Sequence, residues 1–556
     1  MQFGIKRNIL EGPDGAQQRS IYKSMGYTND DLKRPMIGVV NTWNTACPGQ
    51  FNLKQVAESV KAGIYRAGGT PVEFCTIGAC DGIADGNDGM MYILPSRDLI
   101  AQTAEVMTMC HSLDGVVLLG GCDKIVPGLL NAAASLNIPA LFVASGPMMP
   151  GRFKGKDIDV NAPIIGQGAL SVGKITQEEY EEIEAEACPG PGSCTMMGTA
   201  NTMCTFAEAI GMSLPGCAAI PAVNAGRLRI AQESGITIVE MVRKGIKARD
   251  IITVESIRNG IRVCMAVGGS TNLFLHATAL AFYAGLKFDI REFNELSDTT
   301  PYICALIPAS DYTMIDYWAA GGVPAVMKEI SSLLDLNQMT VTGKTVGENL
   351  VPAVNKNPEV IHTMINAIEP TGGLAVVTGN LAPGTGVTRP AVIAAECMYM
   401  RGAAKVFNSE KELFFAINAK QIVDGDIIVV KYEGPKGGPG MREMFVPLEL
   451  LKGMGMDRTT ALITDGRFSG SNSGCFVGHI CPEAADGGPI AIVENGDIIV
   501  IDVNNRTLNI ELSDEEIQDR LAKWVKPEPR IKEGYLALYS QIVGPASEGA
   551  VVGKRF

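Results

Sequence analysis

The sequence has 556 residues, which is enough for two or three domains and excludes a small scaffold held together by disulfides. Hydrophobic residues make up 46% and charged residues 19%, a balance that excludes disorder as the main state. The net charge of −13 argues against nucleic-acid binding, which requires clustered Lys and Arg. Small molecules are therefore the expected partners.

The N-terminal residues 1–15 contain charged side chains and few apolar ones, so they lack the core of a signal peptide. This predicts a cytoplasmic protein, in which the 14 cysteines are thiols rather than disulfides. The longest uncharged stretch, residues 263–286, carries several polar side chains that a lipid-facing helix would have to hide. We expect it to form a buried helix of a globular protein, with no membrane contact.

From residue 34 to about 330, short apolar runs alternate with helical patterns. Residues 36–41, 115–120 and 140–145 are predicted strands, and residues 56–67 are a predicted helix. Such alternation is typical of a mostly parallel sheet covered by helices. The N-terminal part is therefore predicted to be an α/β domain.

After Gly372 the pattern changes to short strands with Gly-rich turns. The predicted strands are residues 426–432, 461–464, 498–503 and 507–512. The last two are separated by Asn504 and Asn505, which predicts a hairpin. We divide the chain into an α/β domain, residues 1–370, and a β-rich domain, residues 371–556.

Asp123 and Lys124 are the only charged side chains in residues 115–151, and they directly follow a predicted strand. Ligands bind at the carboxyl ends of strands in α/β sheets. A buried Asp–Lys pair costs several kcal/mol of desolvation, so a functional role is favoured over a purely structural ion pair. With Cys122 beside them, these residues could hold both a soft and a hard metal ion.

Four further segments carry candidate chemistry. Residues 188–194 place Cys188 and Cys194 in a tight turn before a helix, where a thiolate is favoured, although single cysteines are more often core residues. Residues 81–89 hold three carboxylates and three glycines, which suits Mg²⁺ or an ordinary turn. Residues 432–443 and 464–470 are charged Gly-rich loops or plain β-turns. Phosphate-binding and hydrolase motifs are absent, so neither nucleotide binding nor a serine hydrolase is supported.

Several unusual strings follow one another along the chain. They are Asp81-Gly82-Ile83-Ala84, Leu94-Pro95-Ser96-Arg97, Gly121-Cys122-Asp123-Lys124, Cys188-Pro189-Gly190-Pro191-Gly192-Ser193-Cys194, Gly268-Gly269-Ser270-Thr271-Asn272, Thr342-Gly343-Lys344-Thr345, residues 432–441 and residues 464–470. With these strings in this order, the sequence resembles the dihydroxy-acid dehydratases, within the wider dihydroxy-acid and sugar-acid dehydratase family.

The resemblance implies dehydration of a 2,3-dihydroxy acid to a 2-oxo acid, a step towards valine and isoleucine. It also implies an iron–sulfur cluster, with 2Fe-2S favoured over 4Fe-4S, and a Mg²⁺ ion. The residues it assigns are Cys122 and Cys194 as cluster ligands, Asp81, Asp123, Glu443 and a carbamylated Lys124 as Mg²⁺ ligands, and Ser469 as the base. We predict that the C-terminal domain is β-barrel-like and supplies Glu443 and Ser469. Relatives form dimers or dimers of dimers.

The sequence departs from the family pattern at three places. The position of a third cluster cysteine is Gly49 here, so we predict Cys47 as the third ligand, with Cys80 in reserve. The string around Asp88, residues 86–90, differs from the family's string, which leaves open whether Asp88 contacts the metal. Residues 384–389 also differ, which would alter the preferred acid if they line the substrate site.

Two other functions remain open at this point. A sugar-acid dehydratase would use the same chemistry on a substrate whose extra hydroxyls need polar partners. An iron–sulfur electron carrier or sensor would have no use for the Asp, Glu and Lys set, and would function without Ser469.

Overall fold

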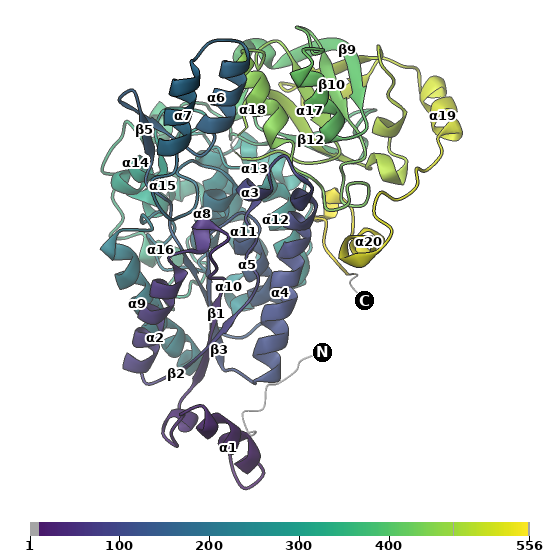
Figure 1. Ribbon diagram of the computed structural model, residues 1–556. Coiled ribbons are helices and arrows are strands. Elements are labelled where there is room, and N and C mark those ends of the chain that lie inside the picture. Colours follow the sequence, from purple (N-terminus) through teal and green to yellow (C-terminus); the bar gives the residue numbers. More distant parts are fainter. Residues whose placement is uncertain (1–9, 471, 554–556) are drawn as a thin grey trace.

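The computed structural model describes residues 10–470 and 472–553 (Figure 1). Most of the N-terminal segment in which we expected no signal peptide lies outside these residues. No helix in the described part of the chain is both long and apolar enough to cross a membrane. All 14 cysteines are free thiols, as predicted.

A four-stranded parallel sheet with the order β2-β1-β3-β4 forms the centre of the N-terminal part. Its strands are β1 (Met36–Asn41), β2 (Thr70–Cys75), β3 (Gly115–Gly120) and β4 (Ala140–Ala144). β1, β3 and β4 are buried along their whole length, which explains why they read as continuous apolar runs. The predicted parallel α/β arrangement is confirmed.

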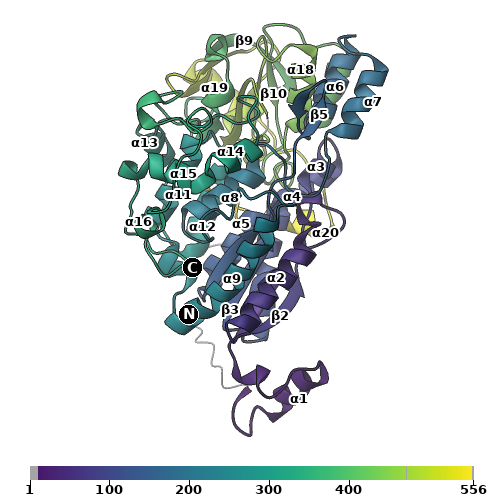
Figure 2. The ribbon, with the colours of Figure 1, turned by 90° about the vertical axis from the view of Figure 1, so that its left-hand side faces the viewer.

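Helices cover both faces of this sheet (Figure 2). On one face, α2 (Leu53–Arg66) packs against α9 (Ala225–Lys244). The two helices touch backbone to backbone, because a Cβ added at Gly63 would lie 2.0 Å from the carbonyl oxygen of Gln232. The other face carries α5 (Ile125–Leu136), with α4 (Ile93–Cys110) behind it.

β4 is the last strand of the parallel sheet in the sequence. The chain between β4 and the C-terminal sheet is mainly helical. A small hairpin, β5 (Gly151–Phe153) and β6 (Lys156–Ile158), comes first. The helices of the N-terminal part not yet given are α1 (Ala16–Ser24), α3 (Asp81–Ala84), α6 (Ala162–Ser171), α7 (Gln177–Glu186), α8 (Thr199–Ala209), α10 (Ala248–Ile251), α11 (Val254–Ala266), α12 (Asn272–Ala284), α13 (Glu292–Asp298), α14 (Met314–Ala320), α15 (Gly322–Glu329) and α16 (Val346–Asn349).

The uncharged stretch 263–286 is buried, but the prediction of one helix there is wrong. It contains the end of α11 and the whole of α12, separated by a turn. Gly268 has φ +62°, a left-handed conformation that ends α11 and that other residues rarely adopt. The turn brings Ser270 and Asn272 into the protein interior, where they serve the site described below.

The C-terminal part is built on an eight-stranded mixed sheet with the order β14-β13-β9-β10-β11-β12-β8-β7. Its strands are β7 (Ala375–Val377), β8 (Thr385–Thr388), β9 (Tyr399–Phe407), β10 (Ile427–Val430), β11 (Ala461–Thr464), β12 (Cys475–Cys481), β13 (Ile498–Asp502) and β14 (Thr507–Ile510). A bridge between Thr378 and Thr507 joins the two edges. The sheet is therefore nearly closed, which confirms the barrel-like prediction, and β13 and β14 form the predicted hairpin.

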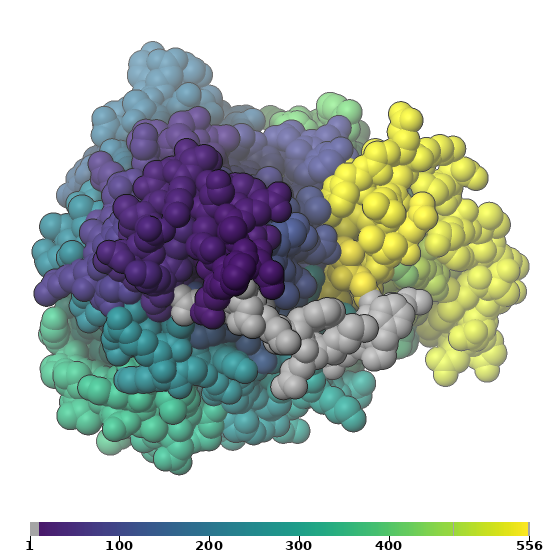
Figure 3. All heavy atoms as spheres, turned by 90° about the horizontal axis from the view of Figure 1, so that it is seen from below, coloured from purple at the N-terminus to yellow at the C-terminus, as the bar shows by residue number. Residues whose placement is uncertain are grey.

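The C-terminal part has four α-helices among the described residues. They are α17 (Glu410–Asn418), α18 (Phe445–Met454), α19 (Asp514–Lys523) and α20 (Gly534–Ile542). α18 packs on α6, and the C-terminal residues lie beside α4, as the yellow region in Figure 3 shows. There Arg97 donates to the carbonyl oxygens of Gly549 at 2.9 Å and Ala550 at 2.8 Å.

Candidate metal centre

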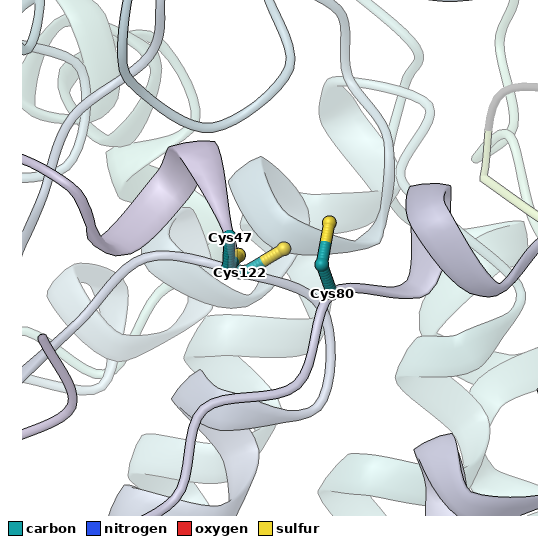
Figure 4. A group of neighbouring side chains, drawn as sticks. All are labelled: Cys47, Cys80 and Cys122. Atoms are coloured by element: carbon teal, nitrogen blue, oxygen red, sulfur yellow. The ribbon is translucent and has the colours of Figure 1, made fainter. Parts of the chain in front are cut away.

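Three thiols meet just beyond the carboxyl ends of the parallel strands (Figure 4). Cys47 follows β1, Cys80 precedes α3 and Cys122 follows β3. Their Sγ atoms all lie within 4.8 Å of one another, and Cys47 and Cys122 are buried. The site therefore lies at the edge of the sheet where the sequence placed it. We call Cys47, Cys80 and Cys122 the thiol group.

The thiol group is suited to binding a soft metal. Hydrogen bonds from Cys122 and Cys47 lower the pKa of Cys80 to about 3, so that one thiolate is held by two thiols. Contact with Cys47 and Cys80, together with burial, raises the pKa of Cys122. Thiolates are the ligands that iron–sulfur clusters and soft metal ions take from proteins, so these three residues fit such a group.

Cys194 borders the thiol group without belonging to it. Its loop packs against the turn that carries Cys47, because the amide of Gly192 donates to the carbonyl oxygen of Pro48 at 3.1 Å. Burial, followed by the charge of Asp81, raises the pKa of Cys194. Of the three cysteines assigned from the sequence, the structure brings Cys47 and Cys122 together and adds the reserve residue Cys80.

Asp81 connects the thiols to the acidic residues. The Cys122 thiol lies 3.4 Å from Oδ1 of Asp81, within the range of a sulfur hydrogen bond. Burial, followed by the negative charge of Asp123, raises the pKa of Asp81 to about 7. The soft and the hard candidate ligands therefore share one site.

A second group, the buried charge cluster, consists of Asp123, Lys124, Glu443 and Arg467. Their exposed fractions are 3%, 1%, 1% and 0%. Asp123 pairs with Lys124, and Glu443 pairs with Arg467. The two pairs adjoin, since Nζ of Lys124 lies 4.0 Å from Oε2 of Glu443 and Nη1 of Arg467 lies 3.9 Å from Oδ2 of Asp123.

The buried charge cluster joins the two parts of the chain. Asp123 and Lys124 lie between β3 and α5, while Glu443 and Arg467 form a bridge beside the barrel. Burial, followed by the charge of Arg467, lowers the pKa of Lys124 to about 8. Two carboxylates and two cations balance each other here, which is the condition for burying four charges.

Asn272 connects this cluster to the turn that carries Ser469. Its Oδ1 lies 3.5 Å from Nζ of Lys124 and 3.4 Å from Nη1 of Arg467. Its Nδ2 donates to the carbonyl oxygen of Phe468 at 3.0 Å. The half-buried Ser469 is thus attached to the cluster through its neighbour Phe468.

The departures from the family pattern lie at the border of the site. Asp88 pairs with Arg442 at 3.0 Å, and its side chain is 83% exposed, so it stands outside the buried charge cluster. In the changed segment 384–389, the buried Arg389 donates to the carbonyl oxygens of Gly470 and Gly268. This segment therefore supports the turn that follows Ser469.

Three polar residues around the site, Asn272, Asn472 and Glu449, had no functional role predicted from the sequence. Asn272 is the last residue of the string 268–272, but nothing in that string indicated that the Asn272 side chain faces Lys124. Asn472 and Glu449 support the turn at Ser469. Glu449 could have been noticed in the sequence, because it is the only acidic residue in the apolar helix α18.

Comparisons with known proteins agree with this arrangement. Residues 34–349 match the model of the dihydroxy-acid/6-phosphogluconate dehydratase N-terminal domain, and residues 359–550 match that of the C-terminal domain. The chain is 50% identical over 546 residues to a dihydroxy-acid dehydratase of Caldicellulosiruptor bescii, which covers 98% of this chain and 99% of the relative.

Two further relatives show the same extent of similarity. A dihydroxy-acid dehydratase of Acetivibrio thermocellus is 49% identical over 546 residues, or 98% of this chain and 99% of the relative. One of Lachnospira eligens is 47% identical over 550 residues, or 99% of each. The thiol group, the buried charges and these matches along almost the whole chain lead to one conclusion: the chain belongs to the dihydroxy-acid/6-phosphogluconate dehydratase family.

Proposed function

We propose that this protein dehydrates 2,3-dihydroxy carboxylic acids, such as 2,3-dihydroxy-3-methylbutanoate, to 2-oxo acids in branched-chain amino-acid biosynthesis. The substrate loses its C2 proton and its C3 hydroxyl as one water, and the resulting enol rearranges to the ketone. The observation that carries this proposal is the contact between the two candidate ligand sets, with Cys122 only 3.4 Å from Asp81. The names of the relatives support the same reaction.

The cluster ligands we propose are Cys47, Cys122 and Cys194, with Cys80 as the alternative third ligand and 2Fe-2S as the favoured cluster. The close approach of the sulfurs of the thiol group supports a cluster at this place. When bound, an iron with an open position would act as a Lewis acid on the 3-hydroxyl, and Mg²⁺ would bind the carboxylate and the 2-hydroxyl.

The Mg²⁺ ligands we propose are Asp81, Asp123, Glu443 and a carbamylated Lys124. Charge balance supports carbamylation. Without metal, the buried charge cluster has two anions and two cations and is neutral. Carbamylation by CO₂ changes Lys124 from +1 to −1 and releases protons, and a bound Mg²⁺ returns the two positive charges that are lost. The buried charge cluster would therefore be neutral in both states.

Ser469 is the proposed base for the C2 proton. A serine hydroxyl is too weak a base by itself, so it needs positive charge nearby. Arg467 stands two residues before it, fully buried and held by the carbonyl oxygen of Met441 at 2.8 Å. Arg467 is thus the cation nearest to Ser469 along the chain and the candidate source of that charge.

The direct test is a substrate panel with the anaerobically purified enzyme. We expect turnover of 2,3-dihydroxy-3-methylbutanoate and little or none of pentonates and hexonates. Preference for a sugar acid would instead identify the protein as a sugar-acid dehydratase of the same family. Ser469→Ala should lose turnover and keep its cluster, whereas Ser213→Ala, which removes a remote buried serine bonded to Phe142, should keep both.

Three broader expectations belong to this proposal. The enzyme would be cytoplasmic and would assemble as a homodimer or a dimer of dimers. The α/β domain, residues 1–370, would carry the cluster and most Mg²⁺ ligands, and the barrel-like domain, residues 371–556, would supply Glu443 and Ser469. Size-exclusion chromatography with light scattering of the loaded enzyme tests the assembly.

A further inference from the structure

We propose that Asn472 and Glu449 are positioning residues that hold the Ser469 turn in its reactive geometry. This inference rests on the proposed role of Ser469 as the base. It concerns two buried polar side chains that do not contact the proposed metal ligands and whose polarity is otherwise unexplained.

The contacts form a short chain from the turn to α18. The amide of Ser469 donates to Oδ1 of Asn472 at 3.0 Å, and the amide of Asn472 donates back to the carbonyl oxygen of Ser469 at 3.2 Å. Nδ2 of Asn472 donates to Oε1 of Glu449 at 2.8 Å and to the carbonyl oxygen of Phe445 at 3.2 Å. Asn472 therefore attaches the turn to one helix by several bonds.

Glu449 and Phe445 together determine which way the amide of Asn472 points. Both present acceptors to the same end of the side chain, so this end must be the NH₂ group. The opposite end, Oδ1, then faces the amide of Ser469. Loss of the carboxylate would remove the stronger of the two acceptors and allow the side chain to turn.

The burial of Glu449 indicates that its carboxyl group has a function in holding Asn472. The side chain is 0% exposed in an apolar helix, where burial raises its pKa by more than the charge of Lys452 on the same helix lowers it. Its second oxygen, Oε2, has no hydrogen-bond partner among the described residues. A buried acid with so little compensation is costly, and a leucine at this position would avoid that cost.

The same helix also connects the turn to the buried charge cluster. α18 begins two residues after Glu443, and the amide of Met444 donates to the carbonyl oxygen of Arg467 at 2.7 Å. One rigid element thus fixes both the Glu443 side of the site and the Ser469 turn. A displacement of about 1 Å between reacting groups can reduce a rate on the order of 100-fold.

The test compares four variants of the loaded, anaerobic enzyme. Asn472→Ala and Glu449→Leu remove the contact, Glu449→Gln keeps an acceptor, and Leu450→Ala is a matched control that weakens the packing of the same helix. For each variant kcat, KM, cluster absorbance, melting temperature and the isotope effect with C2-deuterated substrate are measured.

We expect Asn472→Ala and Glu449→Leu to lower kcat on the order of 10- to 100-fold with KM and cluster absorbance little changed. Their isotope effect should rise, because proton removal becomes more rate-limiting. Glu449→Gln should restore most of kcat. Leu450→Ala should lower the melting temperature without changing the isotope effect.

The proposal is overturned if Glu449→Leu and Leu450→Ala behave alike, or if Glu449→Gln is as slow as Glu449→Leu. Ser469→Ala separates this failure from failure of the proposed function. If Ser469→Ala is inactive while Glu449→Leu is normal, only the positioning role is lost. If Ser469→Ala turns over normally, the base assignment itself is wrong, and the positioning role falls with it.

Discussion

The buried charge cluster makes a quantitative prediction about pairs of substitutions. Glu443→Gln removes one of its two anions and Lys124→Met removes one of its two cations, each from a different part of the chain. Either change alone leaves an unbalanced buried charge. The double variant leaves Asp123 and Arg467, which are opposite in charge and 3.9 Å apart.

The magnitude follows from the distances. Two unit charges 4.0 Å apart, as in Lys124 and Glu443, interact by about 4 kcal/mol at an effective dielectric constant of 20, which reproduces measured energies even at buried sites. Breaking a buried ion pair by removing one partner costs about 3–5 kcal/mol. We therefore expect each single variant to lose about 3 kcal/mol of unfolding free energy, and the double variant to lose about the same rather than twice as much.

The assay is urea unfolding of the metal-free protein in CO₂-free buffer, so that Lys124 is present as the amine. A coupling energy of about 3 kcal/mol between the two substitutions is the expected result. If the two losses simply add to within about 0.5 kcal/mol, the charges do not act on one another and the shared pocket is refuted.

Three further predictions concern the thiols, the helix crossing and the buried acid. Cys122→Ser should lose iron and sulfide on anaerobic purification while Cys188→Ser, which changes an exposed thiol, keeps both; equal iron in the two variants would contradict the thiol site. Gly235→Ala should lower the unfolding free energy by about 3 kcal/mol, because the added Cβ would lie 2.1 Å from the carbonyl oxygen of Val60 and force α2 and α9 apart. An unchanged urea midpoint would show that the two helices can move apart without loss of stability. Burial raises the pKa of Glu449 from its usual value of 4.5 to about 7, so its contribution to stability is complete below pH 4.5 and is lost as the pH rises through 7. In unfolding measurements over this window, Glu449→Gln should therefore gain stability relative to the wild type by about 1.4 kcal/mol per pH unit. A pH-independent difference would mean that Glu449 does not titrate there.

Much of the fold could be predicted because local pattern and burial agree. β1, β3 and β11 were located to the residue, since each is a short apolar run that is buried throughout and bounded by polar or glycine residues. The stretch 263–286 was harder. Its length and lack of charge predicted one buried helix, whereas Gly268 adopts a left-handed conformation at a turn between two helices.

The candidate site was partly predictable for a similar reason. Asp123 and Lys124 stand out because charges are rare in an apolar run, and their position after a strand indicated the edge of the sheet. The choice among cysteines depended on loops whose course no periodic pattern encodes. Cys80 lies with Cys47 and Cys122 at the end of the short segment that joins β2 to α3.

Hydrogen-bonded support for the site was not predictable from the sequence. Asn272, Asn472 and Arg389 act through contacts with segments 80 to almost 200 positions away, or through a turn whose shape the sequence does not state. Residue type alone does not distinguish such side chains from ordinary polar ones.

We propose that a soft-metal site and a hard-metal site adjoin in one pocket. Anomalous diffraction from anaerobic crystals of the loaded enzyme, with Mn²⁺ in place of Mg²⁺, tests it directly. We predict an iron signal at the sulfurs of Cys47 and Cys122 and a manganese signal at the carboxylates of Asp123 and Glu443, with Asp81 between them. Iron bound elsewhere, or manganese away from these carboxylates, would contradict the claim.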